Sequence, residues 1–135
     1  MHRLACSLFL VCAVTAMAGC KKNNCTPEGL TDSWKLTHRQ CYCAPGPVPN
    51  ETVTFTASGF SFFRDGQLVS SGTYSLIASS SACGGRSAGP GLQLTYISGS
   101  NRSTQDAAYK LSGNRLVLDY GGPCDAPVDT YERVR

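Results

Sequence analysis

Apolar and polar residues alternate along most of the chain beyond residue 29. Val53 and Phe55 are separated by threonines, and Leu92, Leu94 and Tyr96 share one phase of the alternation. This two-residue period is typical of β-strands with one buried face, and no stretch keeps the 3.6-residue period of a helix. The pattern predicts eight strands, over residues 32–41, 51–57, 60–64, 67–78, 92–97, 105–111, 115–120 and 128–135.

The first predicted strand sets which residues should face the interior. Trp34, Leu36 and His38 fall on one face of it, whereas Arg39 falls on the other. Because side chains alternate strictly along a regular strand, we expect His38 to be a hydrogen-bonded core residue and Arg39 to face the solvent.

The predicted strands are joined by short links. Asp65-Gly66 is a strong hairpin signal, and Ser112-Gly113-Asn114 reads as a second tight turn. An open eight-stranded sheet leaves two unpaired edges, and closure into a barrel removes them. We therefore expect an all-β fold, an antiparallel up-and-down eight-stranded barrel. Such an interior is filled by side chains or holds one small ligand.

The N-terminal segment has a different pattern. Residues 4–18 form an apolar run of about 15 residues, which is too short to span a bilayer and suits the core of a signal peptide. Met17-Ala18-Gly19-Cys20 follows and resembles a bacterial lipobox, in which the cysteine is lipidated and becomes the first mature residue. This predicts a signal peptide over residues 1–19, a lipidated Cys20 and tether over residues 20–28, and a barrel domain over residues 29–135. The alternative is an ordinary secretory signal cut at Ala16-Met17-Ala18, which leaves Cys20 free.

The predicted lipid anchor implies a bacterial cell envelope and a membrane as the first partner. Neither an Asp nor an acidic run follows Cys20, so we expect anchoring at the periplasmic face of the outer membrane. The chain has 12 basic and 9 acidic residues and a net charge of +3, but the basic residues are scattered. Without a basic stripe, a nucleic-acid partner is not expected.

Four cysteines lie in the predicted domain: Cys41, Cys43, Cys83 and Cys124. An even number in an oxidising compartment predicts two disulfides. Of the three connectivities, bonding between Cys41 and Cys43 is disfavoured by the one-residue gap. The other two pair one of these cysteines with Cys83 and the other with Cys124. Cys25 is then the odd thiol.

Residue patterns of catalytic and metal sites are scarce. His38 is the one histidine beyond the predicted signal peptide, and it could join Cys41 and Cys43 around zinc, although export favours disulfides. Four carboxylates lie late in the chain, and we expect them to be turn caps and outward strand positions: Asp119, Asp125, Asp129 and Glu132. Neither an enzyme nor a resident metal or cofactor is predicted.

Five segments, in this order, resemble the small lipocalin-like domains common in lipoproteins of Bacteroidetes-type bacteria. They are Gly29-x-x-x-x-Trp34-x-Leu36, Val53-Thr54-Phe55-Thr56, Gly72-Thr73-Tyr74, Leu111-Ser-Gly-Asn-Arg-Leu116 and Asp129-Thr-Tyr-Glu-Arg133. The resemblance covers residues 29–135. It implies a lipocalin-like barrel in which Trp34 lies near Arg133 or Arg135. It also favours the disulfides Cys41–Cys124 and Cys43–Cys83, because the first and last strands lie side by side.

Two functions fit these expectations. The first is a binding module for a small apolar or amphipathic molecule, walled by Trp34, Phe55, Phe62, Tyr96 and Tyr109. The second is a protein-binding envelope module, such as a lysozyme or protease inhibitor, with the Ser/Gly-rich loop at residues 79–91 as the inserting element. An interior cavity favours the first function, and a filled barrel favours the second.

Overall fold

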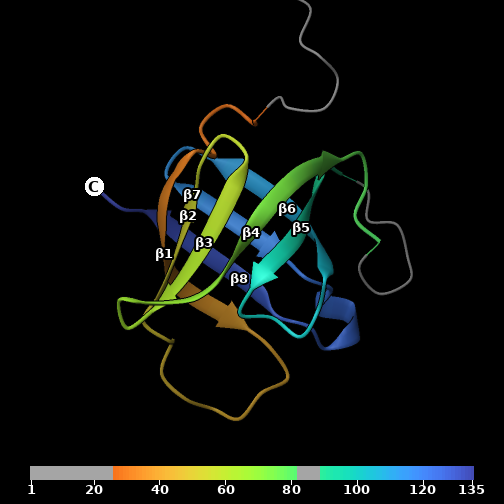
Figure 1. Ribbon diagram of the computed structural model, residues 1–135. Helices are drawn as coiled ribbons and strands as arrows, with labels where there is room; N and C mark the ends of the chain where they lie inside the picture. Colours follow the sequence, from red (N-terminus) through yellow and green to blue (C-terminus); the bar gives the residue numbers. More distant parts are fainter. Residues whose placement is uncertain (1–25, 82–88) are drawn as a thin grey trace, which may run out of the picture.

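The computed structural model describes residues 26–81 and 89–135, which form a closed barrel of eight antiparallel strands (Figure 1). Each strand pairs with the next along the chain, and the last pairs with the first. The predicted all-β, up-and-down barrel is therefore confirmed. The strands are β1 (Asp32–Gln40), β2 (Glu51–Phe55), β3 (Gly59–Arg64), β4 (Gln67–Ile77), β5 (Gly91–Ser98), β6 (Thr104–Ser112), β7 (Arg115–Asp119) and β8 (Val128–Arg133).

Local chemistry explains the tightest turn. Asp65 and Gly66 link β3 to β4 with φ of 52° and 77°, so both residues adopt the left-handed conformation. Asp and Gly tolerate this conformation better than most residues, and paired left-handed residues match the twist of a hairpin. The hairpin that Asp65-Gly66 predicts is confirmed.

The interior of the barrel is a packed apolar core over much of its length. Trp34 and Tyr131 are its largest fully buried side chains. The ring of Trp34 donates a hydrogen bond to the carbonyl of Leu30 (2.9 Å), and the guanidinium carbon of Arg133 lies 4.6 Å from the ring centroid. The expected approach of Trp34 and Arg133 is thus confirmed. The core consists of Leu30, Trp34, Leu36, Val53, Phe55, Phe60, Phe62, Leu92, Leu94, Leu116, Leu118 and Tyr131.

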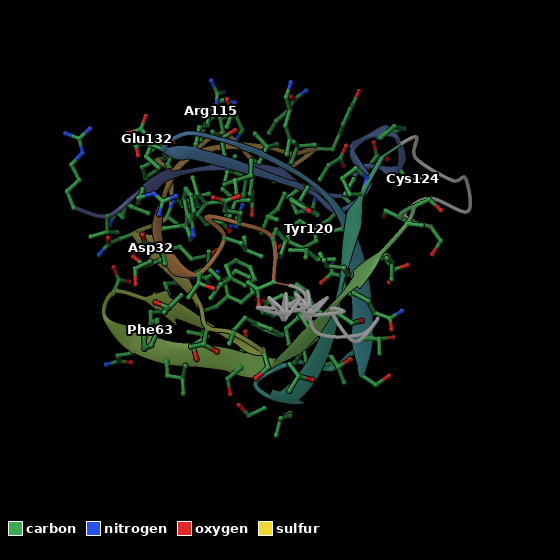
Figure 2. All side chains as sticks on the ribbon, turned by 90° about the horizontal axis from the view of Figure 1, so that it is seen from above. Asp32, Phe63, Arg115, Tyr120, Cys124 and Glu132 are labelled. Atoms are coloured by element: carbon green, nitrogen blue, oxygen red, sulfur yellow. A yellow bond between two sulfur atoms is a disulfide. The ribbon has the colours of Figure 1, made fainter. Side chains whose placement is uncertain are left out.

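The two ends of the barrel differ. At one end, which we call the closed end, the segment that enters β1 lies over the core and buries Leu30 completely. Thr26 donates a side-chain hydrogen bond to the carbonyl of Ala57 in the β2–β3 turn (2.8 Å) and so holds this segment in place. The opposite end, the mouth, is ringed by the loops at residues 41–50, 65–66, 99–103 and 120–127. Seen along the barrel, Tyr120 lies toward the interior, whereas Arg115 and Glu132 point outward (Figure 2).

A β-bulge in β1 reverses the alternation predicted for its second half. Leu36 pairs with Tyr131 but His38 pairs with Thr130, so Thr37 is an extra residue on this strand. The extra residue leaves Thr37 and His38 both exposed and turns Arg39 inward. The expectation that His38 is a core residue and Arg39 an outward one is therefore wrong.

The structure joins Cys41 to Cys43, with Cα atoms 5.3 Å apart. The favoured pairing of Cys41 with Cys124 is therefore wrong. The chain bends directly after β1, which brings the two Cα atoms within the usual range for a disulfide despite the one-residue gap. Cys124, in the 3-10 turn Gly122–Cys124 before β8, is also disulfide-bonded. Cys20, Cys25 and Cys83 lie outside the described residues, as do the predicted signal peptide and most of the predicted tether.

Candidate binding site

The mouth of the barrel contains a hollow of about 390 Å³ above the packed core. Phe62, Val69 and Tyr96 contribute apolar surface to it, whereas four charged side chains contribute polar surface. The lining residues are Arg39, Glu51, Phe62, Arg64, Val69, Ser70, Tyr96, Gly99, Ser100, Gln105, Tyr120, Pro127 and Asp129. They come from seven of the eight strands and from the mouth loops, so closure of the barrel is what brings them together.

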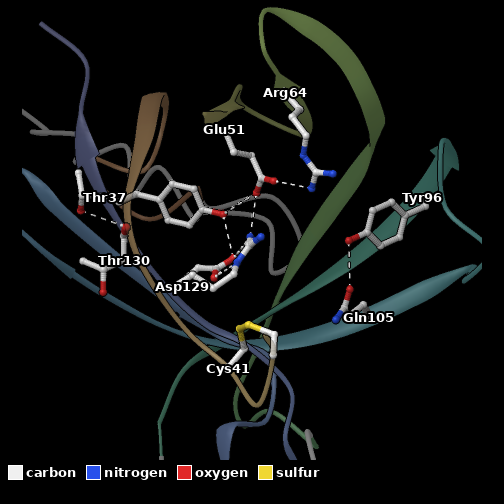
Figure 3. A network of polar contacts seen from close by, with 11 residues as sticks. Thr37, Cys41, Glu51, Arg64, Tyr96, Gln105, Asp129 and Thr130 are labelled. Carbon is white, nitrogen blue, oxygen red and sulfur yellow. Dashed lines mark hydrogen bonds and ion pairs between the residues drawn. A yellow bond between two sulfur atoms is a disulfide. The ribbon is translucent and has the colours of Figure 1, made fainter. Parts of the chain in front are cut away.

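The four charged side chains form a continuous chain of ion pairs, which we call the mouth network (Figure 3). Arg39 donates to both carboxylate oxygens of Asp129, at 2.7 and 2.6 Å. Its terminal nitrogen also donates to Glu51 at 3.1 Å. The second oxygen of Glu51 accepts from Arg64 at 3.0 Å. The network therefore balances two positive charges with two negative ones.

Strand register explains why these residues meet. Arg39 lies opposite Asp129 across β1 and β8, and Glu51 lies opposite Arg64 across β2 and β3. Directly opposed side chains on one face of a sheet are close enough to pair. The bulge at Thr37 is essential, because without it Arg39 would point away from Asp129. The side chain of Thr37 secures the bulge with a hydrogen bond to the carbonyl of Thr130 (3.2 Å).

The carboxylates of the network are more deeply buried than its guanidiniums. The Asp129 and Glu51 side chains are 2% and 7% exposed, against 21% for Arg39 and 54% for Arg64. A buried charge is tolerated only when it is paired and hydrogen-bonded. The hydrogen bonds from Arg39 to Asp129 are the main cause that raises the pKa of Arg39, and burial opposes them. Arg39 therefore remains charged at any physiological pH.

Three tyrosines surround the network as neutral groups. Tyr131 donates to Asp129 (3.3 Å) and Glu51 (3.5 Å), and burial raises its pKa well above the ordinary value. Burial likewise raises the pKa of Tyr120 well above the ordinary value. Tyr96 donates to the side-chain carbonyl of Gln105 (3.1 Å), and its pKa is also raised by burial. The mouth thus combines a charge-balanced wall with phenol rings that can stack on an apolar group and donate hydrogen bonds.

The five residues predicted to wall a ligand do not form one site. Phe62 and Tyr96 line the mouth hollow. Trp34 and Phe55 are 0% and 1% exposed and fill the core. Tyr109 lines a separate hollow of about 610 Å³ at the closed end. That any of the five contacts a ligand stays a prediction.

The sequence pattern did not predict the mouth network. Asp129 was expected to face outward, but its side chain is almost fully buried, so this expectation is wrong. Asp119 and Glu132 do follow the expectation: Asp119 accepts hydrogen bonds from the amides of Gly121 and Gly122 (2.8 Å each), and Glu132 is exposed. Charged residues near the end of a β-strand are ordinarily expected to face the solvent. Arg39 and Asp129 can be recognised as partners only when β1 and β8 are known to be neighbours.

Two further expectations can be placed in the structure. His38 is exposed and Cys41 is bonded to Cys43, so the zinc set considered from the sequence is not assembled. Within residues 26–81 and 89–135, no cluster of three or more His, Cys, Asp or Glu side chains could hold a metal ion. The same part of the chain has no helix with the length and apolar character needed to cross a bilayer. Most of the 79–91 loop, considered as an inserting element, lies outside the described residues.

The fold places the protein in the class of closed, eight-stranded, up-and-down β-barrels, which is consistent with a lipocalin-like domain. No protein-family model matches the chain, and no match is found among curated proteins or solved structures. What the protein does must therefore be inferred from its own residues.

Proposed function

We propose that this protein is a lipid-anchored envelope lipoprotein whose lipocalin-like barrel binds a small amphipathic molecule at its mouth. The observation that carries the binding role is the mouth hollow of about 390 Å³. Pockets for small molecules usually measure about 300–1,000 Å³ and combine apolar walls with a few polar groups. The mouth hollow meets both criteria.

The packed core limits how far a ligand can enter. Phe62 lines the hollow and also belongs to the core, so it forms part of the floor. Below it the interior is occupied by fully buried side chains such as Leu94 and Leu118. The proposed ligand is therefore short and lies across the mouth, unlike a long acyl chain threaded along the barrel axis.

The walls of the hollow indicate a ligand with both apolar and polar parts. Phe62 and Tyr96 offer ring surface, and Val69 adds an aliphatic edge. Arg64 is half exposed and, among residues 26–81 and 89–135, makes one ion pair, to Glu51, so other N–H groups of its guanidinium remain to bind a polar group of the ligand. A ligand that uses them need not break the pair between Arg39 and Asp129.

Filling the hollow tests the binding role. Val69 lines the mouth and does not belong to the core, so Val69→Trp would occupy the space without replacing a core residue. Ile97 is 77% exposed and does not line the hollow, so Ile97→Trp adds the same ring as a matched control. Native mass spectrometry of protein purified under mild conditions from its own host should show a bound mass of a few hundred daltons in the wild type and the control, and none in Val69→Trp. A bound mass that survives Val69→Trp, or no bound mass in the wild type, would refute binding at the mouth.

The anchor is supported by the Met17-Ala18-Gly19-Cys20 sequence. Thioether diacylation and amine acylation at Cys20 would bury enough methylene groups for stable membrane attachment. Metabolic labelling with radioactive palmitate tests this part. We expect label in the wild type and none in Cys20→Ser, whereas equal labelling of the two would exclude Cys20 as the lipidation site.

A further inference from the structure

The loop between β1 and β2, residues 41–50, is the most exposed apolar feature among the described residues. Tyr42 is 91% exposed and Val48 is 43% exposed. Every residue from Tyr42 to Val48 is exposed, and the loop contains no charged residue. In Figure 1 the loop extends away from the barrel at the end opposite the N-terminal segment.

Several constraints restrict the shape of this loop. Pro45, Pro47 and Pro49 fix their own φ angles, and the bond between Cys41 and Cys43 closes a small ring around Tyr42. At the base of the loop, the carbonyl of Asn50 accepts from the Asp65 amide (2.9 Å), and the Asn50 side chain accepts from Lys35. A restricted loop loses less conformational entropy on binding than a flexible one.

The position of the loop argues against the anchoring membrane as its partner. Cys20 lies six positions before Thr26, which is held at the closed end, so a lipid on Cys20 would lie within about 21 Å of that point. β1 then carries the chain to the mouth over a strand length of roughly 25 Å before the loop begins. The loop therefore points away from the membrane, a step that rests on the proposed anchor. The lack of charge also argues against an anionic partner such as a nucleic acid.

We propose that the 41–50 loop is a protein-docking element that inserts Tyr42 into an apolar cleft of a soluble envelope protein. A narrow, convex, uncharged loop is complementary to a concave apolar site. Tyrosine is enriched among the residues that dominate binding energy, because it buries a large apolar ring and keeps a polar group at its tip. The loop is separate from the mouth network, so it adds a second binding function to the first.

Site-specific crosslinking in the living host tests the proposal with the full-length lipoprotein. The photoreactive residue p-benzoylphenylalanine replaces Tyr42 in one strain and Leu76 in another. Leu76 is 42% exposed on β4, near the closed end, and serves as the control. We expect one discrete protein adduct from position 42, absent from position 76, with the crosslinked peptide of the partner identified by mass spectrometry.

Binding of the identified partner to the purified lipoprotein then measures the role of the side chain. We expect Tyr42→Ala to weaken the affinity at least about tenfold and Leu76→Ala to leave it within about twofold. Crosslinks to lipid only, identical adducts from both positions, absence of an adduct, or unchanged affinity in Tyr42→Ala would each overturn the proposal. Palmitate labelling of Cys20 and ligand retention at the mouth are read out separately, so their failure is distinguishable from failure here.

Discussion

Arg39 is the link between two carboxylates that the barrel buries at its mouth. Its guanidinium donates twice to Asp129 and once to Glu51, at 2.6 to 3.1 Å. Arg39→Met keeps most of the aliphatic stem but removes the charge and all three hydrogen bonds. The variant leaves Asp129, whose side chain is 2% exposed, with Tyr131 as its remaining hydrogen-bond donor in the network.

These contacts indicate how much Arg39→Met lowers the free energy of unfolding. Breaking a fully buried ion pair by removing one partner typically costs about 3–5 kcal/mol, because the other charge is left uncompensated. Arg39 is 21% exposed, and Glu51 keeps its contact with Arg64, so part of this cost is avoided. We therefore expect Arg39→Met to lower the free energy of unfolding by about 2–3 kcal/mol. For a domain of this size the melting temperature should fall by roughly 10 °C.

A double-mutant cycle separates the ion pair from other effects of the substitution. Urea unfolding is measured for the wild type, Arg39→Met, Asp129→Asn and the double variant. Because the double variant leaves no unpaired charge between β1 and β8, it should be more stable than the sum of the single losses predicts, by about 1–3 kcal/mol. A loss below about 0.5 kcal/mol in Arg39→Met, or strict additivity in the cycle, would refute the assigned role of the pair.

Three further measurements follow from the structure. Arg133→Met removes the cation–π contact with Trp34 and the hydrogen bonds to the carbonyls at the closed end, so it should cost about 1–2 kcal/mol in urea unfolding, and an unchanged midpoint would contradict this. Burial raises the pKa of Tyr131, so the folded state retains this proton more strongly than the unfolded chain; the associated stability is complete below about pH 10 and is lost as the pH rises further. Urea midpoints at pH 8 and above pH 10 should therefore diverge less in Tyr131→Phe than in the wild type. Trypsin should release residues 40–64 as a single peptide, lighter by two hydrogens for the Cys41–Cys43 bond, whereas a crosslink to the peptide that contains Cys124 would refute this pairing.

The barrel was predictable because its signal is local. The alternation around Val53 and Phe55, or around Leu92 and Leu94, identifies a strand and its buried face without reference to any other strand. Turn residues such as Asp65-Gly66 then fix which strands are neighbours. With eight such strands and no helix to cover a sheet edge, closure was the expected solution. The predicted approach of Trp34 to Arg133 came instead from the resemblance to lipocalin-like domains, and the pairing of β1 with β8 brings it about.

The mouth network was not predictable from the same pattern. Thr37 is an extra residue only relative to β8, so nothing in the sequence of β1 marks the bulge that turns Arg39 inward. Strict alternation therefore placed Arg39 on the wrong face. The bond between Cys41 and Cys43 was missed for a related reason. Its feasibility depends on a bend after β1, and an extended chain would hold the two residues too far apart.

The interior of the barrel is divided into an apolar core and a charged mouth, and this division relates the fold to the proposed functions. Replacing a buried ion pair by packed apolar residues is often neutral or stabilising, so the mouth network is not needed for stability alone. The core toward the closed end is apolar, and the four charges of the mouth network lie at the opposite end, beside Tyr96 and the hollow. The 41–50 loop projects from this same end, and Thr26, the first described residue after the predicted anchor, is held at the other. With the proposed anchor at Cys20, we expect both proposed binding surfaces to face away from the membrane, so that a ligand or partner can approach them without competing with the lipid.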